Sequence, residues 1–118
     1  MIKNMITKNE LQKYLKDGAT LNKNGDAVSL SGYQVSFFDG PQIPAENVGA
    51  VLEAVNEFLT ACPAGAFVGL WLNDSGRVCV DYSENVARLA DAMRLGIERK
   101  QDAIFDWLFM RPISTAND

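Results

Sequence analysis

The sequence predicts an α+β domain of two layers, with a mostly antiparallel sheet of four to six strands, two helices on one face of the sheet, and a short N-terminal helix. Three observations predict this class. Two segments repeat apolar residues at helical spacing, several short runs alternate apolar and polar residues as half-buried strands do, and turn signals separate these segments. We expect a single domain over residues 1–118, with a polar tail from about residue 113.

The N-terminal helix is predicted from its two ends. Thr7 and Glu10 have the spacing of a capping box, in which each side chain accepts a hydrogen bond from the other residue's backbone N–H. Gly18 can adopt the left-handed conformation that closes a helix. A short helix between these two signals follows.

A hairpin is expected after this helix, because Asn24-Gly25 is a strong signal for a two-residue turn. Such a turn would pair Leu21 with Val28. Ser31-Gly32 would then either turn the chain again or mark a bulge in one long strand.

The second helix has the clearest amphipathic pattern in the chain. Pro44 suits its first turn, and Pro63 cannot continue its hydrogen-bond ladder. The apolar positions that recur between them are Val48, Val51, Leu52, Val55, Phe58 and Leu59.

A second hairpin spans residues 67–83, with Asp74-Ser75-Gly76 as a three-residue loop and glycine at its left-handed position. On one face every cross-strand pair is apolar: Leu72 with Val78, Leu70 with Val80, and Val68 with Tyr82. The other face carries Phe67, Gly69 and Trp71 opposite Ser83, Asp81 and Cys79.

The C-terminal part predicts one more helix and one more strand. Ser83 is a candidate N-cap for the helix. Its expected inner stripe consists of Val86, Leu89, Ala90, Met93 and Ile97. Residues 102–110 alternate aromatic and aliphatic side chains on both sides, so we expect this strand inside the sheet.

Charge and composition exclude several kinds of function. The net charge is −4, from 15 acidic and 11 basic residues, and the basic residues are divided almost evenly between the two halves of the chain. We find no basic patch that would bind phosphates, which disfavours direct binding of nucleic acid. The chain has no histidine, the commonest general base and a common zinc ligand. We therefore expect no metal and no cofactor.

The cysteines and the apolar runs bear on the compartment. Cys62 and Cys79 have neither the spacing of a redox motif nor that of a zinc site, so we expect two small buried side chains and a reducing environment. No apolar run has the length of a signal peptide's core or of a membrane span. A cytoplasmic protein of the host cell is expected.

Asp81 is the first candidate for chemistry, because a carboxylate in the middle of a strand is costly unless it is hydrogen-bonded or exposed. Asp106 could meet it across the sheet and complete a pair of acids. The alternative is that Asp81 bonds the backbone or caps the next helix. Without a histidine or an activated nucleophile, two aspartates are weak evidence for an enzyme.

Two further sets of residues could form binding surfaces. Glu46, Glu53 and Glu57 recur on the outer side of the second helix and could imitate a row of phosphates, although outward-facing charges usually serve solvation.

Phe67, Trp71 and Trp107 could form an aromatic patch on the second face of the sheet. Exposed patches of this kind mark interfaces. The alternative is that the first helix or the N-terminal strands cover these side chains.

The segment from Gly65 to Ile113 resembles a pattern found in short uncharacterised proteins of phages and integrated mobile elements. That pattern places a glycine and a tryptophan before a turn, then a Val-Asp strand ending in serine, an alanine-rich helix, and a glutamine before an Ala-Ile-aromatic-Asp strand. Gly32–Ser36 resembles an upstream strand of the same group. The matching residues are Gly69, Trp71, Val80, Asp81, Ser83, Ala92, Gln101, Ala103, Ile104, Phe105 and Asp106.

This resemblance implies a context rather than a reaction, since small acidic phage proteins often bind a host protein, and inhibitors of host defence systems such as CRISPR effectors are one known role. We expect a non-enzymatic interaction module that binds a protein partner or a second copy of itself. Its expected contact residues are Phe67, Trp71, Asp81 and Trp107. The alternatives are a small enzyme that uses Asp81 and Asp106, and an acidic mimic of DNA.

Overall fold

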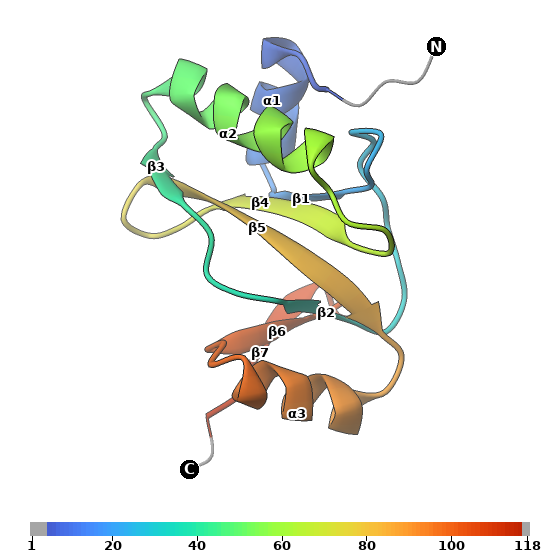
Figure 1. Cartoon of the computed structure of the whole chain (residues 1–118). Helices are drawn as coiled ribbons and strands as arrows, with labels where there is room; N and C mark the ends of the chain where they lie inside the picture. The colour runs from blue at the N-terminus through green and yellow to red at the C-terminus, as the bar shows by residue number, and fades with distance from the viewer. Residues whose placement is uncertain (1–4, 117–118) are drawn as a thin grey trace.

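The computed structural model describes residues 5–116 and has the predicted α+β class, with three helices and one sheet of seven strands (Figure 1). The sheet therefore has more strands than the four to six expected. In chain order the elements are α1 (Lys8–Leu15), β1 (Ala19–Leu21), β2 (Tyr33–Ser36), β3 (Gln42–Pro44), α2 (Val48–Thr60), β4 (Phe67–Leu72), β5 (Arg77–Val86), α3 (Leu89–Glu98), β6 (Ala103–Asp106) and β7 (Arg111–Ser114).

The sheet is antiparallel throughout, with the strand order β1-β4-β5-β2-β6-β7, and β3 pairs with β5 beside this path. Its central strand is β5, which has ten residues. One edge of β5 pairs with β4, while the other edge pairs first with β3 and then with β2. All the other strands are arranged around this one.

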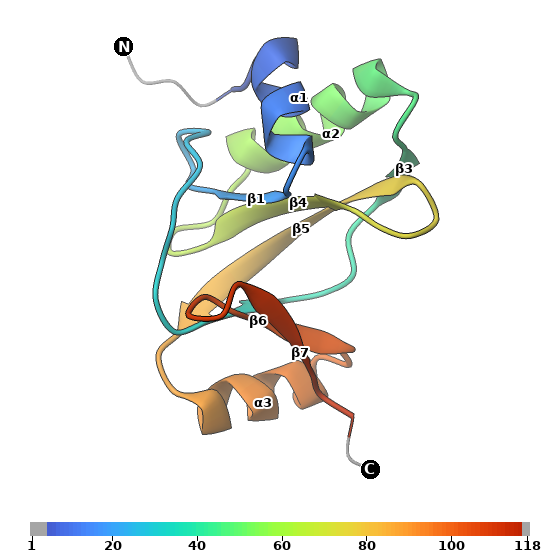
Figure 2. The ribbon, with the colours of Figure 1, turned by 180° about the vertical axis from the view of Figure 1, so that it is seen from behind.

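The helices do not share one face in the way that we expected. Figures 1 and 2 show α1 and α2 together at one end of the molecule and α3 at the opposite end. Val80 and Val86 alternate onto the same side of β5, yet Val80 lies in the core under α1 and α2, whereas Val86 packs in the core beside α3. The twist of a long strand explains this, because it turns one side toward different neighbours along its length.

Helix α1 begins with the predicted capping box. Glu10 N donates to Thr7 Oγ1 at 3.2 Å, and Thr7 N donates to Glu10 Oε1 at 3.0 Å. Gly18 follows the helix with a φ of 78°. The predicted start and end of α1 are both confirmed.

Helix α2 buries the predicted apolar stripe but begins later than expected. Pro44 belongs to β3, and Asn47 caps the helix by accepting a hydrogen bond from Ala50 N at 3.3 Å. The larger core of the molecule lies between α1, α2 and the strands β1, β4 and β5. Its buried residues are Ile6, Leu11, Leu21, Val51, Val55, Leu59, Val68, Leu70, Val78 and Val80.

The β4–β5 hairpin has the predicted register, with Leu72 opposite Val78 and Leu70 opposite Val80. Its loop is held by the Asn73 side chain, whose Oδ1 accepts hydrogen bonds from Ser75 N at 2.9 Å and Arg77 N at 3.0 Å. Gly76 has a φ of 77°, as the three-residue loop requires.

The predicted two-residue turn at Asn24-Gly25 is wrong. Leu21 bridges Ala27 rather than Val28, and Asn22 N bonds Asp26 O at 2.9 Å. The reason is the Asn22 side chain, which accepts from the backbone N–H groups of Asn24 and Asp26 as Asn73 does in the other hairpin. Both loops share the sequence Leu-Asn-x-x-Gly.

Neither alternative for Ser31-Gly32 is correct, because β2 pairs with β5 and β6 and not with the segment before it. Gly32 has a φ of 70°, and its carbonyl oxygen accepts a hydrogen bond from Trp107 N at 3.1 Å. This glycine therefore joins the start of β2 to the end of β6.

Helix α3 begins later than predicted, and the side that it turns to the sheet is different from the predicted one. Strand β5 continues past Ser83 to Val86, and Arg88 occupies the N-cap position. The helix buries Ala92 and Gly96, while Leu89 and Ile97 are 45% and 48% exposed. A Cβ atom on Gly96 would lie 2.9 Å from Ile104 Cγ2, so the helix turns its smallest residues to the sheet to approach it closely.

The last predicted strand ends early. Strand β6 stops at Asp106, whose Oδ1 accepts a hydrogen bond from Leu108 N at 2.9 Å, and the chain turns through residues 107–110 into β7. Strand β7 spans residues 111–114, so the first residues of the polar tail expected from about residue 113 are part of the sheet. Among the described residues, no helix is long and apolar enough to cross a membrane.

Replacing Gly76 with valine should lower the free energy of unfolding by about 1 kcal/mol or more, because a branched residue is strained at positive φ. No atom lies within 4 Å of the position that a Cβ would take, so the loss isolates the backbone term. Urea denaturation followed by circular dichroism measures it. Gly49→Ala is the control: Gly49 lies in α2 with equal free space, and alanine should stabilise the helix there. Equal stability of Gly76→Val and the parent would contradict the loop geometry.

Candidate functional site on the second face of the sheet

Asp81 lies at the centre of the face that points away from the large core. Its Cα partner on β4 is Gly69, as predicted. A Cβ atom on Gly69 would lie only 2.6 Å from Asp81 Oδ1, so glycine provides the space that the carboxyl group fills. On the other side, the Ser36 hydroxyl donates a hydrogen bond to Asp81 Oδ2 at 2.7 Å.

The pKa of Asp81 is raised from 3.8 to about 6. Burial is the largest cause, because it removes water from the charged form, and the negative charge of Asp39 raises the pKa further. The hydrogen bond from Ser36 acts in the opposite direction. Asp81 therefore exchanges its proton close to neutral pH, as general acids and bases do.

Asp39 is brought near this site by a close approach of the chain to β5. A Cβ atom on Gly40 would lie 1.7 Å from Val80 O, so only glycine fits there. Pro41 O accepts a hydrogen bond from Val80 N at 3.1 Å, and Gln101 Nε2 donates to Asp39 Oδ1 at 3.2 Å. The segment between β2 and β3 is thus held against the central strand.

A buried hydrogen-bond network lies beside Asp81 on the same face. Gln34 Nε2 donates to Ser83 Oγ at 3.0 Å, and Gln34 Oε1 accepts from Trp107 Nε1 at 3.0 Å and from Asn85 Nδ2 at 3.1 Å. Gln34, Ser83 and Trp107 are all buried. Because the polar atoms bond one another, this network serves to join β2, β5 and the end of β6.

The aromatic residues do not form the single exposed patch that we considered. Trp107 is 8% exposed and packs edge-to-face on Phe105, with ring centroids 5.1 Å apart. Phe67 is half-buried opposite Ser83. Trp71, by contrast, is 49% exposed, and the adjacent Leu72 is 50% exposed. Of the predicted aromatic contact residues, only Trp71 presents a large surface to solvent.

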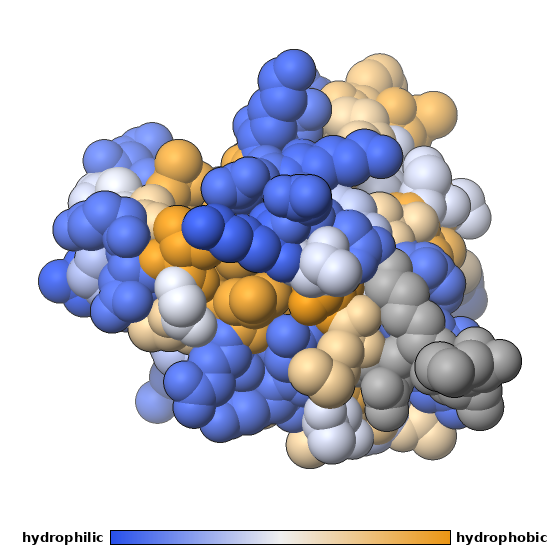
Figure 3. Space-filling view, turned by 90° about the horizontal axis from the view of Figure 1, so that it is seen from above, coloured by the Kyte–Doolittle hydropathy of each residue, from blue (hydrophilic) through white to orange (hydrophobic). Residues whose placement is uncertain are grey.

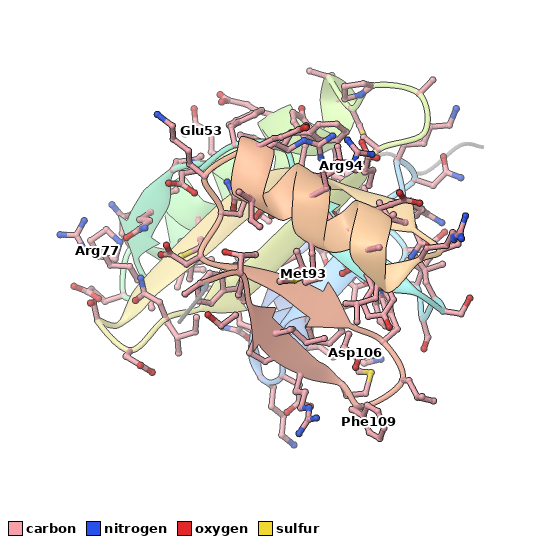
Figure 4. The ribbon with its side chains drawn as sticks, turned by 90° about the horizontal axis from the view of Figure 1, so that it is seen from below. Glu53, Arg77, Met93, Arg94, Asp106 and Phe109 are labelled. Atoms are coloured by element: carbon pink, nitrogen blue, oxygen red, sulfur yellow. The ribbon has the colours of Figure 1, made fainter. Side chains whose placement is uncertain are left out.

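Asp106 does not meet Asp81. Tyr33 pairs with both Val86 and Asp106, which places Asp106 on the face of Val86, and alternation along β5 places Asp81 on the opposite face. Asp106 is buried and bonds Leu108 N, beside the β6–β7 turn (Figure 4). The expected pair of acids is therefore wrong, and the reason is strand register.

The three candidate glutamates are exposed, whereas the two cysteines are at least partly buried. Glu53 and Glu57 lie exposed on the outer side of α2, and Glu46 is exposed in the segment before it. Cys79 is buried and Cys62 half-buried, and burial raises the pKa of both thiols. Among residues 5–116, no group of three or more acidic or cysteine side chains is arranged to hold a metal ion.

Sequence reasoning identified Asp81 but missed its partners. Ser36 and Gln34 are ordinary polar residues of a short strand, and they gain importance only from the pairing of β2 with β5. The pairing of Ser36 with Ser83 continues a polar row across the sheet, and no local signal in the sequence indicates that pairing.

Comparison with known proteins identifies no relative. No family model matches the chain, and neither a curated protein nor a solved structure does so. Function has to be inferred from the residues of the chain itself.

Asp81→Asn should change the dependence of stability on pH. The raised pKa means that the folded state binds the proton more tightly than the unfolded state, so the proton stabilises the fold fully below about pH 4 and this contribution is lost as the pH rises through about 6. Asparagine is always neutral. Between pH 4 and 7 the wild type should lose stability relative to Asp81→Asn by at most about 3 kcal/mol, in urea denaturation at a series of pH values.

Ser36→Ala is the matched variant for this measurement, because it keeps the carboxyl group and removes the hydrogen bond that lowers its pKa. Removing that bond raises the folded-state pKa further, so the loss of stability should again begin near pH 4 but continue to a higher pH than in the wild type. Identical pH profiles for the wild type and Asp81→Asn would show that Asp81 has an ordinary pKa.

Proposed function

We propose that this chain is a non-enzymatic protein-binding module of a phage or mobile element, and that its partner is a protein of a host defence system, such as a CRISPR effector. The observation that carries the binding role is the exposure of Trp71, whose side chain is 49% exposed on the second face of the sheet. Tryptophan is among the residues that contribute most to binding energy at protein interfaces.

The position of Trp71 supports this role. It lies on the β4–β5 hairpin, whose register is held along six residue pairs and whose loop is fixed by Asn73. A side chain on such a rigid element loses little further freedom on binding, which favours affinity. The origin of the partner is proposed from the sequence resemblance, which includes Trp71 itself.

Trp71→Ala should weaken partner binding by about 2 kcal/mol or more while the domain stays folded, because much of this side chain is outside the core. The chain is immobilised, proteins are captured from a lysate of host cells that carry the defence system, and the affinity for the captured protein is then measured with purified components. Circular dichroism reports folding.

Ile97→Ala is the matched control, since Ile97 is 48% exposed on α3, far along the chain from the hairpin. It should bind like the parent. Equal binding by Trp71→Ala and the parent would place the contact surface elsewhere. In cells, the wild type should restore infection in the presence of the defence system, and Trp71→Ala should not.

One observation favours a second candidate, an enzyme that uses Asp81 as a base. The Ser36 hydroxyl lies 2.7 Å from a carboxyl group with a pKa of about 6, which is the distance expected of a nucleophile and its base. Asp106 has no part in this alternative. Loss of a hydrolytic activity in both Ser36→Ala and Asp81→Asn, with partner binding intact, would support it against the binding module.

A further inference from the structure

The β6–β7 turn exposes three consecutive large apolar side chains, which we name the tip: Leu108, Phe109 and Met110, at 80%, 64% and 61% exposed. The tip is not a loose loop. Leu108 N is bonded to Asp106 Oδ1, and the preceding Trp107 is buried, with its indole N–H bonded to Gln34. A rigid base therefore presents an apolar surface that gains from being covered.

The backbone of the tip adds a second observation. Met110 has a φ of 53°, a left-handed conformation that glycine adopts easily and that costs free energy for other residues. Glycine would suit this position better for folding alone. A large apolar side chain is present instead, in a place where it contributes little to the core.

The opposite end of the molecule carries a shallow groove with the complementary character, which we name the α2 groove. Met5 and Leu52 supply apolar surface, with Gly49 leaving room between side chains, and Glu53 and Glu57 stand on its rim. Figure 3 views this end from above and shows apolar surface between hydrophilic side chains. Within the described residues, neither glutamate forms an ion pair.

A positive charge lies next to the tip. Arg111 follows Met110 directly and is exposed, and its guanidinium group lies 5.2 Å from the centre of the Phe109 ring. A partner for the tip must therefore offer an apolar hollow with carboxylates at its edge. The α2 groove has this combination, with two glutamates one helical turn apart.

We propose that the chain binds a second copy of itself head to tail, with the tip of one copy in the α2 groove of the next and Arg111 facing Glu53 and Glu57. A copy cannot fill its own groove, because the two surfaces lie on opposite sides of the molecule, as the positions of Phe109 and Glu53 in Figure 4 show. Each pairing leaves one tip and one groove free, so the contact adds further copies instead of stopping at two.

This self-association goes beyond the proposed function and uses other residues. A contact built on three apolar side chains and one ion pair belongs to the weak class of interfaces. It should appear as a sedimentation coefficient that rises with protein concentration across the micromolar to millimolar range, and it should weaken in high salt. Trp71→Ala should associate like the parent, so the failure of one proposal leaves the other standing.

Sedimentation of tip and rim variants tests the contact. Phe109→Ser combined with Met110→Gly removes two of the three apolar side chains of the tip, and the glycine relieves the strained φ, so the fold is retained. Glu53→Lys combined with Glu57→Lys reverses the charge on the rim of the α2 groove, and both positions are exposed, so the fold should be unaffected. Each double variant should associate at least tenfold more weakly than the parent. The control Ile97→Ser, which removes an exposed apolar side chain from α3, should associate like the parent.

Mixing the two double variants tests the head-to-tail geometry. The tip variant keeps an intact groove and the rim variant keeps an intact tip, so an equal mixture should form dimers and nothing larger. Arg111→Glu should likewise associate with the rim variant at least tenfold more strongly than with itself. Association of either double variant at the parent's strength would overturn the proposal, and so would a mixture that stays monomeric.

A wild type that stays monomeric at every concentration would also overturn it. In that case, binding of the tip to vesicles of neutral or anionic phospholipid, or to the partner captured through Trp71, would assign the exposed tip to a different occupant.

Discussion

Every other element depends on the hydrogen bonding of β5 along both of its edges. Strand β4 occupies one edge, while β3 and β2 share the other in succession. Between those two strands the chain still stays against β5, since Phe37 N bonds Tyr82 O and Val80 N bonds Pro41 O. This continuous pairing explains why Gly40 and Gly69 are required, because each lies where a side chain would collide with β5 or with Asp81. The central strand thus determines both the architecture and the environment of the Asp81 carboxyl group.

Local signals in the sequence predicted local structure correctly. The capping box of Thr7 and Glu10 and the register of the β4–β5 hairpin depend on residues close together in the chain. The rotation of α3 could not be predicted in this way. The spacing of its apolar residues predicted that a larger stripe through Leu89 and Ile97 would face the sheet. In the structure Gly96 packs closely on Ile104 instead, and Leu89 and Ile97 stay exposed. Nothing near Gly96 in the sequence indicates that contact.

The same division applies to the candidate site. Asp81 could be identified because a charged residue opposite glycine is unusual in a strand, and its place opposite Gly69 follows from the hairpin alone. Its hydrogen bond to Ser36 depends on the pairing of β2 with β5, between residues that are 45 positions apart. The prediction that Asp106 lies near Asp81 was wrong for a related reason, because only the register of β2 with β6 decides which face of the sheet Asp106 occupies.

The division of the interior into two cores has a consequence for local unfolding. The core beneath α1 and α2 contains ten buried apolar residues, whereas the one beside α3 contains Val35, Ala92 and Ile104. Because opening a region costs free energy roughly in proportion to the apolar surface exposed, the end formed by α3, β6 and β7 opens at a lower cost than the rest. We therefore expect amide protons of this end to exchange with solvent through partial openings, and those of β4 and the first half of β5 to exchange only when the whole domain unfolds.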